Sequence, residues 1–79
     1  KVYRITQKKT TLNVKAGSTA LLYIVPSSRN DILRSYKSRG GLQVSFIDQN
    51  TVKVVFPKRS SSGRVSLGLG KRKVYFTIE

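Results

Sequence analysis

The chain has 79 residues and carries 16 Lys and Arg against three Asp and Glu, a formal net charge of +13 at pH 7. It contains no Cys and no His, so disulfides, thiolate metal sites and the most common general base near neutral pH are excluded. A chain of this length makes one domain, residues 1–79, with a small core. No apolar run is long enough to cross a membrane, and because the chain starts at Lys1 we expect an excised domain or a processed product.

The first third of the chain predicts three strands. Residues 2–6 and 11–15 alternate apolar and polar side chains, which is the pattern of a half-buried strand. Residues 20–25 are apolar on both faces, so we predict a central strand that is covered on both sides and ends at Pro26. A turn at residues 16–18 joins the second and third strands, and we interpret this pair as a hairpin.

The segment that follows interrupts the strand period. Ile32, Leu33 and Tyr36 fall on one helical face, and Gly40 suits the position after a helix C-terminus. We therefore predict a short helix over residues 31–38 that leans on the sheet, because two helical turns are marginal alone. The alternative is an irregular loop that crosses from one sheet to the other.

The second half predicts four more strands. Residues 42–46 and 51–56 alternate around a polar turn, which indicates a hairpin. Residues 64–69 and 73–79 alternate again and are joined by a turn at Gly70-Lys71, which lacks the spacing and the following helix of a phosphate-binding loop. The fold class is therefore all-β, an antiparallel sandwich of about seven strands with one short helix.

The sequence offers few residues that could catalyse a reaction. The carboxylates Asp31, Asp48 and Glu79 are scattered and form no catalytic pair. Without His, only a Ser–Lys arrangement could activate a serine, and Ser60-Ser61-Ser62 beside Lys58 has the composition of a flexible loop. We predict no enzyme, no catalytic residue, no metal site and no cofactor.

The cations are the strongest functional signal because few acids are interspersed among them. Loops collect at the ends of a sandwich, so we expect the predicted helix and the loop after Phe56 to lie at one end and to form a patch of Arg34, Lys37, Arg39, Lys58 and Arg59. The predicted anion-binding residues are Arg29, Arg34, Lys37, Arg39, Lys58, Arg59, Arg64, Lys71, Arg72 and Lys73.

Aromatic side chains divide into two groups. Phe46, Phe56 and Phe76 occupy inward positions of their strands and are predicted to lie in the core. Tyr36 and Tyr75 are the candidates for stacking on a base, since single-strand binding pairs cations with exposed aromatic rings.

Residues 5–28, ITQKKTTLNVKAGSTALLYIVPSS, run as a strand, a Leu-x-Val pair, a Gly-Ser/Thr turn, an apolar strand and a Pro. This order resembles the first third of bacterial immunoglobulin-like domains of the group-2 type. The matching residues are Leu12, Val14, Gly17, Ser18, Thr19, Leu21 and Pro26. The resemblance implies an immunoglobulin-like sandwich that is a spacer or binding module on cell surfaces, secreted proteins or phage particles, with no catalytic residue. The chain departs from the family pattern at residues 29–40, where the family has a Trp strand, and in its basicity.

We therefore expect a non-enzymatic immunoglobulin-like module that docks an anionic partner: a cell-surface polymer, nucleic acid or an acidic protein. It would act at the cell surface, outside the cell or on a virion. One alternative is a small β-barrel that binds nucleic acid in the cytoplasm through the same cations with Tyr36 and Tyr75. Another is a structural subunit that self-assembles, or joins a larger parent chain, by pairing an exposed edge such as residues 1–6.

Overall fold

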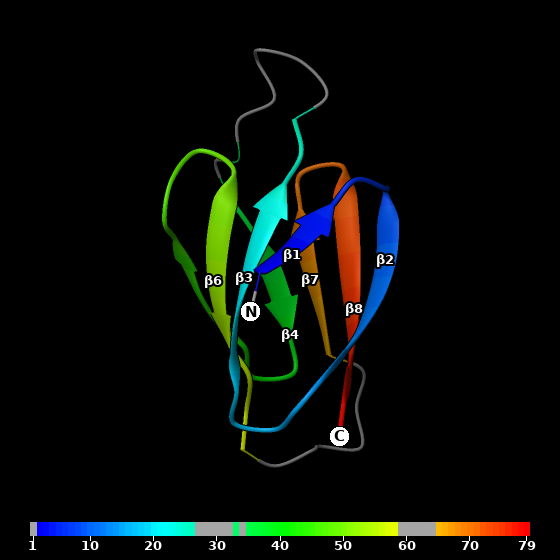
Figure 1. Ribbon diagram of the computed structural model, residues 1–79, viewed down its shortest axis with the longest axis vertical. Coiled ribbons are helices and arrows are strands. Elements are labelled where there is room, and N and C mark those ends of the chain that lie inside the picture. Colours follow the sequence, from blue (N-terminus) through cyan, green and yellow to red (C-terminus); the bar gives the residue numbers. More distant parts are fainter. Residues whose placement is uncertain (1, 27–32, 34, 59–64) are drawn as a thin grey trace.

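The computed structural model describes residues 2–26, 33, 35–58 and 65–79. These residues form eight strands and no helix, and most of the strands run along the long axis of the molecule (Figure 1). In chain order, the strands are β1 (Val2–Ile5), β2 (Lys9–Val14), β3 (Thr19–Ile24), β4 (Lys37–Arg39), β5 (Gln43–Phe46), β6 (Thr51–Val55), β7 (Val65–Leu69) and β8 (Arg72–Ile78).

The strands form two separate four-stranded sheets, with the orders β1-β3-β6-β5 and β2-β8-β7-β4. Both sheets are mixed: β1 is parallel to β3 and β2 is parallel to β8, whereas the other neighbours are antiparallel. The prediction of an all-β fold is confirmed, but the prediction of a purely antiparallel sandwich is wrong, because β1 and β2 each pair in parallel with a neighbour. Because each sheet keeps its own two edge strands, the architecture is a two-layer sandwich and not one closed barrel.

The core lies between the two sheets and follows the predicted alternation in the second half of the chain. Phe56 and Phe76 meet there, with their ring centroids 4.8 Å apart and the ring planes inclined at 65°. Such an edge-on aromatic pair adds about 1 kcal/mol beyond the area it buries. The largest of the other completely buried side chains are Ile5, Leu22, Ile24, Val52, Val54, Leu67, Leu69 and Val74.

The predicted helix over residues 31–38 is wrong for the part of this segment that the structure describes. Leu33, Ser35 and Tyr36 are not helical, and β4 begins at Lys37. Residues 31, 32 and 34 lie outside the described residues. The three residues of β4 pair antiparallel with β7, whose backbone needs partners at this edge. A two-turn helix is too short to compete with that pairing.

The predicted hairpin of the second and third strands is also wrong. Both strands exist, but β2 pairs with β8 and β3 pairs with β1 and β6, so the two lie in different sheets. The turn between them bonds to a different part of the chain: Gly17 has a φ of 74° and its N–H donates to the carbonyl oxygen of Pro57 at 2.9 Å. This turn carries the chain from one layer to the other.

β3 is a central strand as predicted, but only one of its faces is covered. Ala20, Leu22 and Ile24 are buried in the core. On the other face Leu21 is half-buried and Tyr23 is 37% exposed. No described element lies over that face, because the sandwich has only two layers.

Candidate anion-binding face

The register of the β2-β8-β7-β4 sheet aligns cations on its outer side. Residues that are paired across neighbouring strands point to the same side of a sheet. One such row is Lys37, Gly68, Lys73 and Lys9, and the next row is Arg39, Ser66, Tyr75 and Thr11. We call this surface, defined by Lys9, Lys37, Arg39 and Lys73, the basic face.

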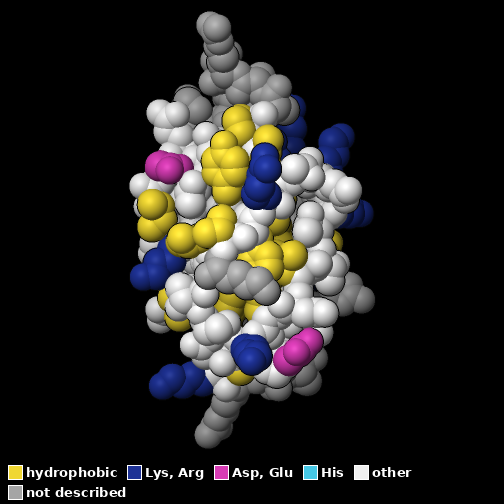
Figure 2. All heavy atoms as spheres, in the orientation of Figure 1, with side chains coloured by type: hydrophobic (Ala, Val, Ile, Leu, Met, Phe, Trp, Pro, Cys, Tyr) yellow, Lys and Arg dark blue, Asp and Glu magenta, His cyan; other side chains and the backbone are white. Residues whose placement is uncertain are grey.

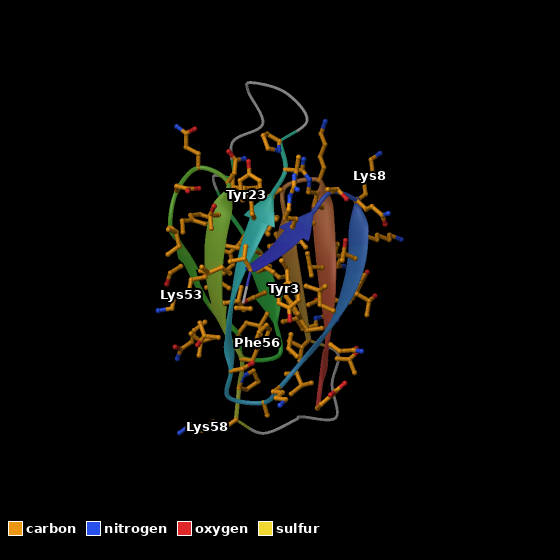
Figure 3. All side chains as sticks on the ribbon, viewed as in Figure 1. Tyr3, Lys8, Tyr23, Lys53, Phe56 and Lys58 are labelled. Carbon is orange, nitrogen blue, oxygen red and sulfur yellow. The ribbon has the colours of Figure 1, made fainter. Side chains whose placement is uncertain are left out.

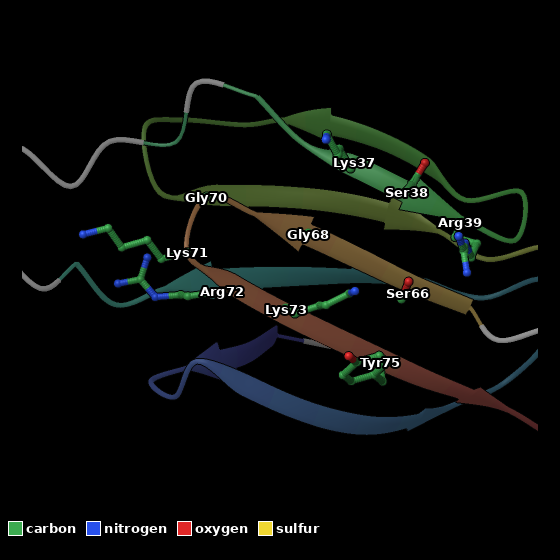
Figure 4. A pocket seen from close by; sticks show the side chains of 10 residues that line it. All are labelled: Lys37, Ser38, Arg39, Ser66, Gly68, Gly70, Lys71, Arg72, Lys73 and Tyr75. Atoms are coloured by element: carbon green, nitrogen blue, oxygen red, sulfur yellow. The ribbon is translucent and has the colours of Figure 1, made fainter.

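The basic face is hollowed along β7. The hollow has a volume of about 580 Å³. Figure 4 shows Lys37 and Arg39 on β4 at one side, and Lys73 on β8 at the other. The hollow arises because the residues of β7 on this face are small: Gly68 has no side chain and Ser66 has a short one. We call it the β7 hollow, and its lining is Lys37, Ser38, Arg39, Ser66, Gly68, Gly70, Lys71, Arg72, Lys73 and Tyr75.

The charge around the β7 hollow is of one sign. Lys37, Arg39 and Lys73 are exposed, and no acidic side chain of the described residues lines the hollow. The two acids among the described residues lie elsewhere: Asp48 is in the turn between β5 and β6, and Glu79 follows β8. Figure 2 shows these two acidic side chains apart, toward opposite ends of the molecule. A bound anion would therefore relieve repulsion among the cations of the basic face.

Both stacking candidates have a partner within the protein. The Nζ of Lys73 lies 5.6 Å from the centroid of the half-buried Tyr75 ring, a cation–π distance. Tyr36 meets Phe46 edge-on, with ring centroids 5.9 Å apart at 88°. Each ring therefore already has one neighbour within the protein, and Tyr36 is 43% exposed.

Phe46 corrects the prediction that all three Phe side chains are core residues. It is 40% exposed, and its ring contact is Tyr36, which is itself 43% exposed. Phe46 ends β5, an edge strand, so no further strand covers it. The predictions for Phe56 and Phe76 are confirmed.

Arg72 and Lys71 stand at one end of the β7 hollow and differ in what they can do. An Nη of Arg72 donates a hydrogen bond to the carbonyl oxygen of Val25 at 3.0 Å, and the side chain is half-buried. Arg72 thus contributes to joining the two sheets. Lys71 is exposed in the β7–β8 turn, where Gly70 has a φ of 60°. The predicted turn at these residues is confirmed.

Lys58 does not join the basic face. It lies at the end of the sandwich opposite the β7–β8 turn (Figures 1 and 3), with its Cγ 3.5 Å from where a Cβ on Gly17 would be. Lys58 lines a pocket with Gly41, which is two residues after Arg39, so the expected patch stays a prediction for Arg39 and Lys58. Lys37 and Arg39 are on a strand, and the sheet aligns them with β8. The predicted residues Arg29, Arg34, Arg59 and Arg64 lie outside the described residues.

Sequence reasoning missed Lys9, Ser66 and Gly68. The alternation was visible over residues 11–15, but nothing local indicated that the strand begins at Lys9 or that it pairs in parallel with β8 and brings Lys9 beside Lys73. Glycine inside a strand was the one available signal for the hollow, since such a residue often marks a close approach by another chain or a ligand.

Other chemistry finds no support in the described ranges 2–26, 33, 35–58 and 65–79. They contain no group of three His, Cys, Asp or Glu side chains that could hold a metal ion. Within these same ranges, no helix has the length and apolar character needed to cross a membrane. The chain matches no protein-family model, and no curated protein is similar to it.

Proposed function

We propose that this protein is a non-enzymatic immunoglobulin-like module that docks an anionic partner through the basic face. The strand order supports the immunoglobulin-like part of the proposal. In the constant-type fold, the first, second, fifth and fourth strands form one sheet and the third, sixth and seventh form the other. After the first strand, the orders β3-β6-β5 and β4-β7-β8 follow this scheme. The first part of the chain departs from it: β1 is parallel to β3, and β1 and β2 run in opposite directions in different sheets (Figure 1). The resemblance of residues 5–28 to bacterial domains of this kind agrees with it.

The observation that carries the docking proposal is the alignment of cations from three distant segments. Lys37 on β4, Lys73 on β8 and Lys9 on β2 share one row of the sheet. Their backbones are held by ladder hydrogen bonds, so the charges are positioned before a partner arrives. Docking would be fast and weakened by salt, because exposed charges are screened over about 8 Å at physiological ionic strength. An anionic cell-surface or virion polymer suits this mechanism.

The test compares two triple variants that change the net charge equally. Lys37→Gln, Arg39→Gln and Lys73→Gln remove the centre of the basic face. Arg4→Gln, Lys53→Gln and Lys58→Gln remove exposed cations from other parts of the molecule, as Figure 3 shows for Lys53 and Lys58.

The measurement is the Kd for full-length heparin, a general polyanion, by fluorescence anisotropy at several salt concentrations. We expect the basic-face triple to weaken binding by at least about tenfold and the control triple by less than about threefold. Equal losses in the two triples would mean that net charge alone drives binding. Absence of wild-type binding at 0.15 M salt to heparin, single-stranded DNA and anionic vesicles would overturn the proposal. Sedimentation velocity on the same samples tests the alternative, self-assembly through the edge strand β1.

A further inference from the structure

Gly68 is not required by the fold. Its φ is outside the left-handed region that favours glycine, and a Cβ built on it would be 3.6 Å from the carbonyl oxygen of Lys37, an ordinary contact. A glycine inside a strand lowers stability, because it adds backbone entropy to the unfolded chain and packs no side chain. Neither backbone conformation nor packing explains why this position of β7 has no side chain.

Gly40, directly after β4, shows what a structurally required glycine looks like. Its φ is 97°, and a Cβ there would lie only 2.8 Å from Cγ2 of Val65. Gly40 is therefore fixed by sterics, whereas Gly68 leaves room on the outer side of the sheet. The consequence of Gly68 is the β7 hollow itself, with Lys37 on one side and Lys73 on the other.

We infer that Gly68 keeps the β7 hollow open for a single chain of an unbranched acidic polysaccharide, whose charged groups contact Lys37 and Lys73 from between them. This inference rests on the proposed function and names its ligand class. The strands that carry Lys37 and Lys73 are two ladder steps apart, about 10 Å between backbones. Such a gap admits one narrow chain, whereas a flat bilayer surface would meet only the tips of the cations.

The remaining lining favours a sugar chain over a nucleic acid. Ser66 and Tyr75 add hydroxyl groups to the β7 hollow, and a hydroxyl both donates and accepts hydrogen bonds, as sugar hydroxyls do. Binding of single-stranded nucleic acid usually depends on rings that stack on bases. The Tyr75 ring has the Lys73 ammonium 5.6 Å from its centroid, and the Tyr36 ring contacts Phe46.

The test fills the β7 hollow without changing any charge. The variants are Gly68→Ala and Gly68→Val, and the control is Ser45→Val, which adds a β-branched side chain at an exposed position of β5 in the other sheet. The probe is a heparin hexasaccharide, and binding is measured by isothermal titration calorimetry. Thermal unfolding of each variant is recorded in parallel, and we expect Gly68→Val to be at least as stable as the wild type, because Val suits a strand better than Gly.

We expect Gly68→Val to weaken hexasaccharide binding about tenfold, Gly68→Ala to have an intermediate effect, and Ser45→Val to have none. Equal hexasaccharide affinity in Gly68→Val and the wild type would overturn the inference while leaving the proposed function standing. So would a wild type that binds single-stranded DNA or anionic vesicles but not the hexasaccharide. If Gly68→Val were unfolded, Gly68→Ala would decide the matter: it must bind the hexasaccharide more weakly than Ser45→Val does, or the inference is wrong.

Discussion

Arg72, at the start of β8, donates a hydrogen bond to the carbonyl oxygen of Val25, 47 residues earlier in the chain, at 3.0 Å. Val25 directly follows β3, so this bond links the end of one sheet to the other. The backbone N–H of Val25 in turn donates to the carbonyl oxygen of Ile5 at 3.0 Å, which ties β1 into the same end of the sandwich.

Arg72 is therefore expected to act more on stability than on anion binding. Arg72→Met should lower the free energy of unfolding by about 1.5–3 kcal/mol, the size of a hydrogen bond that involves a charged group. Urea denaturation measures this, with Lys71→Met as the control that removes the same charge from an exposed neighbour. If both variants unfold at the same urea concentration, the Arg72–Val25 bond contributes nothing.

Gly40 and Gly41 allow two requirements for glycine, a positive φ and a lack of space for a Cβ, to be measured separately. Both have positive φ, 97° and 82°, but only Gly40 has a close neighbour, Val65, where a Cβ would be. Gly41→Ala should cost about 1 kcal/mol from backbone strain alone. Gly40→Ala should cost about 2 kcal/mol more because of the clash with Val65. The midpoints of chemical denaturation give the difference, and equal midpoints would show that β7 shifts to accept the methyl group.

Two apolar residues test where the core ends. Leu67 is completely buried on β7, so Leu67→Ala should lower the free energy of unfolding by about 2–5 kcal/mol. Phe46→Ala removes a larger side chain but should cost only about 1 kcal/mol, because Phe46 is 40% exposed and its ring contact is Tyr36. Thermal unfolding ranks the two variants. A larger loss for Phe46→Ala would place the edge of β5 in the core.

Asp48 should make stability depend on pH in the acidic range. Its Oδ1 accepts the Asn50 backbone N–H at 2.9 Å, and this bond, followed by the Thr51 side chain, lowers the pKa of Asp48 below its ordinary value of 3.8. The folded-state pKa is below that of the unfolded chain, so this contribution is present above about pH 4 and is lost as the pH falls through the folded-state value. Asp48→Asn should flatten this part of a plot of Tm against pH between pH 2 and 5. An unchanged slope would contradict the effect.

Features of the fold that depend on neighbouring residues could be predicted from the sequence, whereas contacts between distant segments could not. The pairing of β5 with β6 and of β7 with β8 was readable, because each pair is joined by a short turn and its inward residues alternate along one stretch. The parallel partners of β1 and β2 were not, since β2 meets β8 only at the far end of the chain. β4 was mistaken for a helix because Leu33 and Tyr36 fit a helical spacing, and an edge strand of three polar residues carries no apolar alternation.

The candidate site likewise has some features that the sequence predicted and others that only the tertiary structure decided. The excess of cations, the absence of His and Cys, and the outward positions of Lys73 and Tyr75 came from the sequence alone, because composition and alternation are properties of single segments. Only the tertiary structure decided that Lys37 and Lys73 flank Gly68, that Lys9 completes their row and that Lys58 lies elsewhere. The physical reason is that backbone hydrogen bonding between strands is nearly independent of side-chain identity. Which segments become neighbours is therefore settled by the packing of the whole core, and the charges on their outer faces follow.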